Sequence, residues 1–312
     1  MDLLESLPCP ALMRGEELME NRGMRDLMER EEAALLLDSV TPGEKKTVMI
    51  GGKRYTALLS AAGLLLLVPG DGEERDGDDP ALSNAAASLR DAVSTAVLVA
   101  AALRKKNDPV SRRYAEPLSR NIDRIVRIAD NLQTASLGAK DVMHEENLAS
   151  VLIEAADQVN YYLGAGSVDL RVELGDPVLV CCRELIVSLF MNLTVEALLP
   201  AEKEKIAVFL RPGKTYALDF LIPSAPGRRE EWEEMLFGGK GEGTGFAAAR
   251  RVVSLHKGGI FLREEGDKLL VHVTFSRSLR VGADVFGPET LYRGGDYVYM
   301  MLSPLKNRSA RD

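Results

Sequence analysis

The sequence has 312 residues, so at about 100–200 residues per domain two or three domains are expected. Its composition, 46% hydrophobic and 28% charged, is sufficient to build buried cores and excludes a disordered or collagen-like chain. Aromatic residues make up 5%, and the net charge is −8, from 39 basic and 47 acidic residues. A surface that stacks bases or binds nucleic acid non-specifically is therefore not expected.

No export signal or membrane segment is predicted. The three cysteines, Cys9, Cys181 and Cys182, cannot form a disulfide framework, because adjacent cysteines rarely pair with each other. The first residues include Asp2, whereas a signal peptide begins with basic residues. The longest apolar run, 57–69, is shorter than the roughly 20 residues of a membrane helix. We therefore expect a cytoplasmic protein.

The N-terminal part, 1–70, is expected to form a small α+β module. Residues 47–50, 53–60 and 63–69 predict three strands, and the Gly-Gly pair between the first two suits a tight hairpin turn. The segment that follows, 71–80, is rich in acids and contains glycines and a proline, a composition typical of a linker.

The region 81–140 is expected to form a helical hairpin. Apolar residues recur with alternating spacings of four and three from Leu82 to Leu103, and again from Leu118 to Ser136. An Asp-Pro turn signal separates the two patterns. Because two helices cannot cover their own apolar stripe, we expect a second copy to complete a four-helix bundle, which makes the protein a homodimer.

The region 145–279 is expected to alternate helices with strands, and no role is predicted for the tail, 280–312. Glycine-containing turns separate the strands of each expected hairpin. The expected elements are helices at 145–163, 182–199 and 245–256, a strand at 168–174, hairpins at 206–222 and 260–275, an irregular charged stretch at 223–240, and a strand at 297–302 in the tail.

Two motifs of this region resemble those of sensor histidine kinases. GEGTGFAAARRVVSLHKGG, at 241–259, is similar to the family's second glycine box and the helix after it, and Gly241, Gly243 and Gly245 match its three glycines in spacing. ELIVSLFMNLTVEALL, at 184–199, is similar to the family's N box, NLLxNA.

The resemblance extends over roughly residues 1–275 and implies the fold. It implies a multi-domain α+β protein: a PAS-like sensor module at 1–70, an acidic linker at 71–80, a dimerisation and phosphotransfer hairpin at 81–140 that forms a dimeric four-helix bundle, and a Bergerat-type α/β sandwich ATPase-like domain at 145–279. It also implies ATP and Mg²⁺ as cofactors. The implied partner is a response-regulator receiver domain or another histidine kinase.

The phosphoacceptor histidine of that family is missing. AASLRDAV, at 86–93, places Ala87 where the H box, SHELRTPL, has its histidine. A methyl group is no nucleophile, so autophosphorylation at that position is excluded and a pseudokinase is predicted. The three histidines of the chain, His144, His256 and His272, lie outside the first helix of the hairpin, and we expect them to be structural or solvated.

The residues of the implied nucleotide site are also altered. Glu196 replaces the second Asn of the N box; a carboxylate suits Mg²⁺ but adds negative charge beside a triphosphate. Pro223 replaces the Asp of the family's DxGxG motif and has no side-chain oxygen to accept a hydrogen bond from adenine. The glycine loop either still binds phosphate or is a structural remnant. The candidate nucleotide-binding residues are Asn192, Glu196, Gly227, Gly241, Gly243 and Gly245, with Glu196 as the candidate Mg²⁺ ligand.

Basic residues are concentrated on the hairpin of this acidic chain. They form either a solvated helix face or a docking surface for an acidic partner, with Arg90, Arg120, Arg124 and Arg127 as candidates. No DNA-recognition helix accompanies them. We therefore expect a histidine-kinase-like protein of two-component signalling that dimerises and binds a response regulator or a partner kinase. The alternatives are an ATP-binding sensor kinase that acts in trans on a partner, and a structural scaffold.

Overall fold

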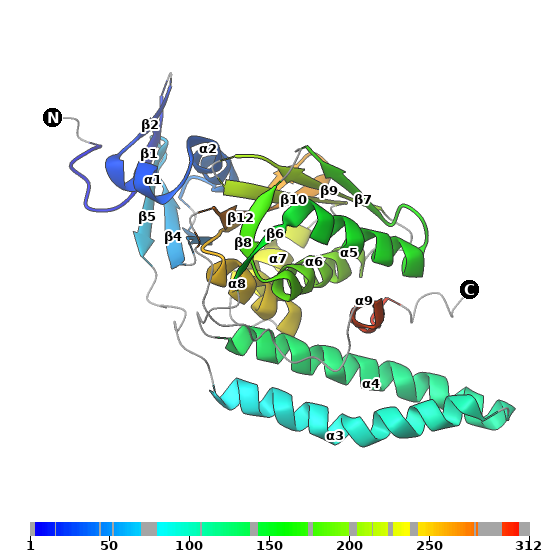
Figure 1. Cartoon of the computed structure of the whole chain (residues 1–312). Coiled ribbons are helices and arrows are strands. Elements are labelled where there is room, and N and C mark those ends of the chain that lie inside the picture. The colour runs from blue at the N-terminus through cyan, green and yellow to red at the C-terminus, as the bar shows by residue number, and fades with distance from the viewer. Residues whose placement is uncertain are drawn as a thin grey trace.

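The computed structural model describes residues 4–15, 17–43, 45–51, 53–69, 80–106, 108–137, 143–173, 177–199, 205–213, 215–223, 227–237, 243–277, 279 and 295–305. These residues form a ten-stranded sheet, helices packed against it, and a long two-helix hairpin (Figure 1). The expected mixed α+β fold is confirmed.

The N-terminal half of the sheet carries two short helices. Its strands are β1 (Ala11–Arg14), β2 (Leu18–Glu20), β3 (Lys45–Ile50), β4 (Lys53–Leu59) and β5 (Leu64–Pro69), and its helices are α1 (Arg22–Leu27) and α2 (Arg30–Ser39). The three strands expected from the sequence are confirmed as β3, β4 and β5. The strands β1 and β2 were not expected, because runs of four and three residues are too short to show an alternation of apolar and polar residues.

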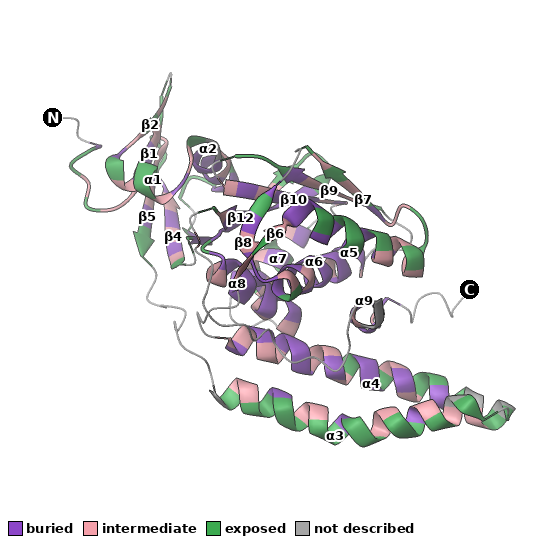
Figure 2. Cartoon of the chain, viewed as in Figure 1, coloured by how far each residue is buried: buried purple, intermediate pink, exposed green. Residues whose placement is uncertain are grey.

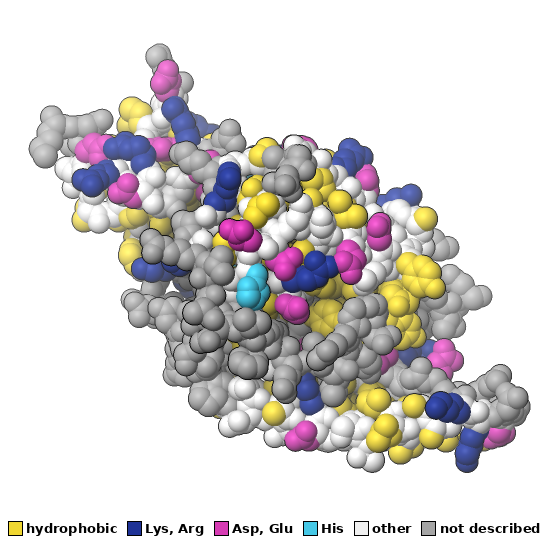
Figure 3. Space-filling model, viewed as in Figure 1, with side chains coloured by type: hydrophobic (Ala, Val, Ile, Leu, Met, Phe, Trp, Pro, Cys, Tyr) yellow, Lys and Arg dark blue, Asp and Glu magenta, His cyan; other side chains and the backbone are white. Residues whose placement is uncertain are grey.

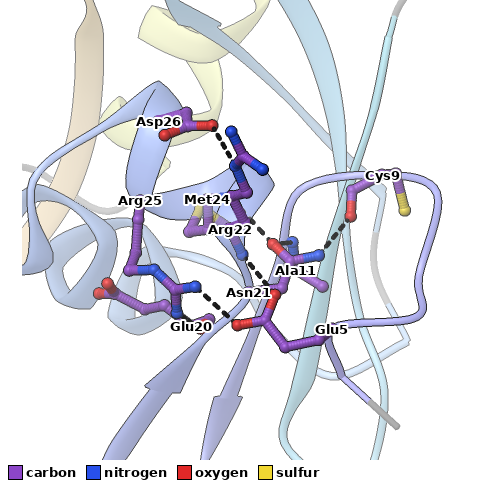
Figure 4. A network of polar contacts seen from close by, with 9 residues as sticks. All are labelled: Glu5, Cys9, Ala11, Glu20, Asn21, Arg22, Met24, Arg25 and Asp26. Atoms are coloured by element: carbon purple, nitrogen blue, oxygen red, sulfur yellow. Dashed lines mark hydrogen bonds and ion pairs between the residues drawn. The ribbon is translucent and has the colours of Figure 1, made fainter. Parts of the chain in front are cut away.

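Asn21 fixes the chain where β2 ends and α1 begins (Figure 4). Its side-chain oxygen accepts hydrogen bonds from the backbone N–H groups of Ala11 and Met24, each at 2.9 Å. Its amide nitrogen donates to the carbonyl of Cys9 at 2.9 Å. Asn21 therefore caps α1, and it also fixes the start of β1 through Ala11 and the residue before Pro10 through Cys9.

The hairpin consists of α3 (Pro80–Lys105) and α4 (Pro109–Ser136), which pack along each other as expected. Asp108 caps α4 by accepting hydrogen bonds from two backbone N–H groups of its first turn, and Pro109 is the first helical residue. Pro117 lies in the interior of α4. The expected linker at 71–80 lies outside the described residues, apart from Pro80.

Helix α3 has a largely exposed apolar surface in this chain (Figure 2). Its segment Ala81–Leu103, with a mean hydropathy of 1.5, is long and apolar enough to cross a membrane by length and composition alone, and 17% of its most apolar stretch is buried. No membrane segment was predicted here from the sequence, because polar residues such as Ser83, Arg90 and Ser94 interrupt the apolar run. In the structure α3 packs on α4 through buried residues such as Ala86 and Val93, while Leu98 is 71% exposed.

The C-terminal half of the sheet is associated with the larger helices. Its elements are β7 (Val168–Val172), β9 (Ile206–Arg211), β10 (Thr215–Pro223), β11 (Ile260–Glu265), β12 (Lys268–Ser276), α5 (Leu148–Leu163), α6 (Arg183–Leu198), α7 (Arg228–Phe237), α8 (Thr244–Leu255) and α9 (Gly295–Met301); β6 (His144–Asn147) and β8 (Val178–Cys181) pair separately. The strand order is β2-β1-β5-β4-β3-β11-β12-β10-β9-β7, with β7 and β9 parallel. Helices α5, α6 and α8 enclose the main core with β9, β10 and β12.

The two halves of the sheet meet at β3 and β11, which pair at Met49 and Ile260. Lys46 lies beside this junction with its side chain buried. Its ammonium group donates to the carbonyl of Ser39 at 2.9 Å and to a carbonyl of β11 at 3.1 Å, and pairs with Glu233 of α7 at 2.8 Å. The N-terminal strands are thus fixed to both β11 and α7.

Three sequence-based expectations are wrong. The segment 297–302, expected as a strand, belongs to α9 and the turn after it, because a short apolar run does not distinguish a helix from a strand. The charged stretch 223–240, expected to be irregular, contains α7, which is anchored by the fully buried Trp232. The helix expected from 145 begins at 148, because Asn147 caps it and the residues before it form β6.

Candidate functional site

The N-box-like residues lie where α4, α6 and α8 meet. Helix α6 is apolar on nearly all sides and is enclosed by other helices and the sheet, as such a helix must be. Asn192 and Glu196 are separated by one helical turn, and both contact side chains of α4. Gly245, in the first turn of α8, lies against Asn192. The structure therefore brings three of the candidate nucleotide-binding residues together.

Asn192 is engaged by α4. The residue is 1% exposed, and its amide nitrogen donates to Asn131 Oδ1 at 2.8 Å and to the carbonyl of Ser188 at 3.0 Å. Asn131 in turn donates weakly to the hydroxyl of Thr244 in α8, at 3.4 Å. Asn192 Oδ1 has no hydrogen-bond partner among the described residues. This oxygen and Arg127 Nε are buried polar atoms of the site that have no hydrogen-bond partner among the described residues.

Glycine at position 245 is required by this packing. A Cβ atom there would lie 2.8 Å from Asn192 Oδ1 and 3.4 Å from a guanidinium nitrogen of Arg127. The first of these distances is shorter than van der Waals contact allows, so α8 approaches α6 as closely as it does only because the residue has no side chain.

Glu196 is paired with Arg127 of α4. The carboxylate Oε1 lies 3.1 Å from Arg127 Nη2, and the two side chains are 19% and 11% exposed. A largely buried carboxylate needs a counter-charge, and here the guanidinium provides it. The residue that the resemblance assigns to Mg²⁺ is therefore neutralised within the chain.

Glu196 is a poor Mg²⁺ ligand in this arrangement. Its carboxylate is already neutralised by Arg127, and a metal ion on the same carboxylate would lie beside the guanidinium and be repelled by it. The amide nitrogen of Asn192 is held by Asn131 and Ser188, while its Oδ1 has no partner among the described residues. The side chains as arranged here therefore do not fit a bound Mg²⁺.

The remaining candidate residues of this site lie around it. Gly243 is the N-cap residue of α8 and, having no side chain, makes no capping hydrogen bond. Gly241 lies outside the described residues. Gly227 has φ +81°, a left-handed conformation that favours glycine, directly before α7. At the altered adenine motif, buried Arg228 donates to the carbonyls of Pro223 and, at 2.7 Å, of Ala197 at the end of α6. A cation thus joins β10 to α6 here.

The four candidate docking arginines fall into two pairs. Arg90 donates two hydrogen bonds, at 3.0 and 2.6 Å, to one oxygen of Asp130. Arg90 and Arg127 thus both pair with carboxylates of the same chain. Arg124 is exposed, and among the residues that the structure describes Arg120 pairs with the exposed Glu116, at 3.4 Å. Ala87 is exposed on α3, one turn before Arg90. Arg120 and Arg124 are therefore the two that face solvent.

Two of the three histidines are buried and serve as structural contacts. His256 accepts a hydrogen bond from the N–H of Cys182 at 3.4 Å through Nε2, which leaves Nδ1–H to donate to a carbonyl of α8 at 2.7 Å. Burial lowers the pKa of His256 to about 4, so the ring is neutral at pH 7. His272 Nδ1 lies 2.5 Å from Asp219, which also pairs with Arg211 at 3.2 Å.

The adjacent cysteines show no sign of reactivity or metal binding. Cys181 and Cys182 are buried, and burial raises the pKa of each thiol to about 12, so both stay protonated at neutral pH. His144 pairs with Cys181 across β6 and β8. In the part of the chain that the structure describes, no group of three His, Cys, Asp or Glu residues could hold a metal ion.

Two residues of this site were not identified from the sequence. Asn131 and Tyr297 contact the N-box helix from α4 and α9, far away in the chain. Asn131 lies off the apolar seam that predicted α4, and Tyr297 lies in a segment expected to be a strand. Polar residues recur along the whole of α4, so the pair 130–131 gave no distinguishing signal in the sequence.

Comparisons with known proteins find similarity in fold but not in sequence. No family model and no curated protein matches the sequence. Among solved structures, full-length ShkA in complex with AMPPNP aligns over 64% of this chain with a TM-score of 0.51 and 15% identity. The alignment covers 47% of that structure, so this chain corresponds to about half of it. The chain has a sensor-histidine-kinase-like fold, which confirms the expected resemblance at the level of fold.

Two other solved structures that match, with lower TM-scores, are of proteins named as histidine kinases. The Acinetobacter baumannii histidine kinase AdeS aligns over 60% of this chain and 98% of its own, with a TM-score of 0.43 and 15% identity. The histidine kinase ThkA, in complex with the response regulator TrrA, aligns over 88% of this chain and 98% of its own, with a TM-score of 0.43 and 13% identity.

Proposed function

We propose that this chain is a histidine-kinase-like protein of two-component signal transduction that acts by binding and has no autokinase activity. The observation that carries the proposal is Ala87, exposed on α3 at the phosphoacceptor position, where its methyl group provides no nucleophile. The engagement of Asn192 by Asn131 and of Glu196 by Arg127 supports the same conclusion, because these N-box side chains face α4 instead of a ligand.

The proposed protein is a homodimer through the hairpin. Leu98 and Val99 on α3 are 71% and 48% exposed in the single chain. Burying a large aliphatic side chain contributes about 1.5–3 kcal/mol, so a second hairpin packed on this face would be stabilised by it. The apolar segment of α3 is then covered by protein, in agreement with the proposed cytoplasmic location.

The proposed partner is an acidic protein, either the receiver domain of a response regulator or a partner kinase. The exposed guanidinium of Arg124 and the partly exposed one of Arg120 lie one turn apart on α4. Figure 3 shows further basic side chains near the tip of the hairpin. Charge complementarity of this kind mainly increases the association rate and selects the partner.

The N-terminal module, 1–70, is the proposed PAS-like sensor, followed by the linker 71–80, the hairpin 81–140, the ATPase-like domain 145–279 and the tail 280–312. Five antiparallel strands with two short helices support the first assignment. A signal received there has a direct route to α7 through the ion pair of Lys46 with Glu233, in addition to the route through the hairpin.

The alternative is an ATP-binding kinase that acts in trans on a partner. It is favoured by one observation: Gly243 and Gly245 open α8 beside Asn192, and the N-terminus of a helix favours a phosphate group. Binding of Mg-ATP together with phosphorylation of a second protein would support this alternative.

Labelling with ATP tests the proposed function. The purified full chain is incubated with Mg-ATP labelled at the γ-phosphate, beside an Ala87→His variant that restores the acceptor. We expect no acid-labile phosphate on the wild-type chain. Label on the wild-type chain would overturn the proposal; label on Ala87→His alone would uphold the absence of an acceptor and show that a nucleotide still binds.

A further inference from the structure

Helix α9 is built into the core although it lies beyond the last strand of the sheet. Val298, Met300, Met301 and Leu302 are at most 2% exposed and belong to the main hydrophobic core. The helix contacts α4 of the hairpin on one side and α5 and α6 on the other (Figure 1). Seven residues of α9 therefore connect the hairpin to the ATPase-like part of the molecule.

Tyr297 brings α9 to the polar residues around the N-box helix. Its side chain hydrogen-bonds with Ser188 of α6, and the charges of Asp130, Arg127 and Arg90 act on it. Burial of the phenol group raises the pKa of Tyr297, so the hydroxyl stays protonated. Ser188 also accepts the hydrogen bond from Asn192, so the contacts of α9 and those of α4 meet on the same turn of α6.

The attachment of α9 consists of a few side-chain contacts. Besides Tyr297 and the apolar residues, the ring of Tyr299 packs edge-on against Tyr162 of α5, with centroids 5.2 Å apart. A helix of this length is not stable in isolation, since isolated helices shorter than about 12–15 residues are marginal in water. Helix α9 therefore forms only while it is docked.

We propose that α9 is an intramolecular strap that holds α4 against α6 and α8, and that its release frees Asn192 and Glu196 from their partners on α4. The strap explains why the N-box side chains are engaged by the hairpin in this arrangement. Helix α4 also packs directly on α8, so detachment of α9 removes one of the attachments that hold the hairpin to the ATPase-like part, which makes α9 a regulatory element.

Hydrogen exchange on the full chain tests the strap. Met301→Asp places a charge at a fully buried position of α9, and Met19→Asp makes the same change on β2, at a position that is 38% exposed, as a matched control. We expect Met301→Asp to accelerate amide exchange in α6 and in the C-terminal half of α4 about tenfold, without change in β10 and β12. Met19→Asp leaves exchange unchanged in all four elements.

Carboxyl footprinting provides a second reading. A carbodiimide with glycine ethyl ester should modify Glu196 faster in Met301→Asp than in the wild-type chain, while Asp219, paired with His272, keeps its reactivity. Unchanged exchange and footprinting would overturn the strap, as would equal acceleration in β10 and β12, which would make α9 an inseparable part of the core. Neither reading depends on phosphate or on a partner, so this inference can fail while the proposed signalling role stands.

Discussion

Arg127 of the hairpin and Glu196 of the N-box helix form an ion pair, with 3.1 Å between Nη2 and Oε1. The pair joins two elements that are far apart in the sequence, and it neutralises the carboxylate at the position that the histidine-kinase resemblance assigns to Mg²⁺. Glu196 therefore links α6 to α4 through this ion pair. The pair gives a structural reason for a glutamate where the family's motif has Asn.

Arg127→Ala should destabilise the protein, because it leaves a largely buried carboxylate without its counter-charge. We expect a loss of roughly 2–4 kcal/mol in the free energy of unfolding, measured by urea denaturation. Arg120→Ala removes a guanidinium from the same helix that pairs with the exposed Glu116, and should cost less than about 1 kcal/mol. Equal losses in the two variants would show that Glu196 does not depend on Arg127.

Gly245→Ala should also destabilise, although alanine normally favours a helix over glycine by about 1 kcal/mol. The added methyl group would meet Asn192 Oδ1 at 2.8 Å, and overpacking of this kind costs roughly 1–3 kcal/mol. The double variant Gly245→Ala/Asn192→Ala removes the atom that is hit, so its destabilisation should be smaller than the sum of the two single effects. Additive effects would contradict the described contact.

The stability of the protein should fall in weak acid because of His256. Its pKa is about 4 when folded, against an ordinary value of about 6.5, so between these pH values the unfolded chain binds more protons. The contribution of His256 is complete above pH 6.5 and is lost as the pH falls toward 4. Between pH 7.5 and 5 this loss amounts to about 2 kcal/mol.

Urea denaturation at these two pH values measures the effect of His256. The variant His256→Gln, which cannot titrate, should lose about 2 kcal/mol less than the wild-type chain over the same interval. The comparison of the two differences removes the contribution of the carboxylates that titrate in both proteins. An identical pH dependence of the two proteins would show that His256 is not held neutral.

Leu98→Asp should weaken the dimer. The substitution places a charge on the exposed apolar face of α3, and the dissociation constant measured by analytical ultracentrifugation should rise at least tenfold, or about 1.4 kcal/mol. Val110→Asp adds the same charge near the tip of the hairpin, at a residue that is 62% exposed, and serves as the control. A monomeric wild-type chain, or equal weakening by both variants, would contradict dimerisation through this face.

Periodicity and turn chemistry predicted most of the elements correctly. The seams of α3 and α4, the Asp-Pro boundary at 108–109 and the strands β3 to β5 follow from local signals, because each has enough residues to show its period. The helix α9 could not be predicted, since the exposed Tyr299 lies between the buried Val298 and Met300, an alternation that fits a strand equally well. Its packing against three helices decides its structure.

The sequence predicted which residues form the candidate site but not which side chains contact them. The motif resemblance located Asn192, Glu196 and Gly245, which the fold brings together. Their partners on α4 depend on how the hairpin lies against α6, a long-range contact that no local pattern encodes. For the same reason Arg127 was expected to contact a partner protein, whereas in this arrangement it forms an ion pair with Glu196 of the same chain.

Isothermal titration of the full wild-type chain with Mg-ATP tests most directly the claim that the N-box residues are committed to α4. Because Glu196 is neutralised by Arg127 and Asn192 donates to Asn131, we predict no saturable binding up to about 1 mM nucleotide, the concentration at which a standard binding free energy of about −4 kcal/mol would be detected. Saturable one-to-one binding below that concentration would contradict the account.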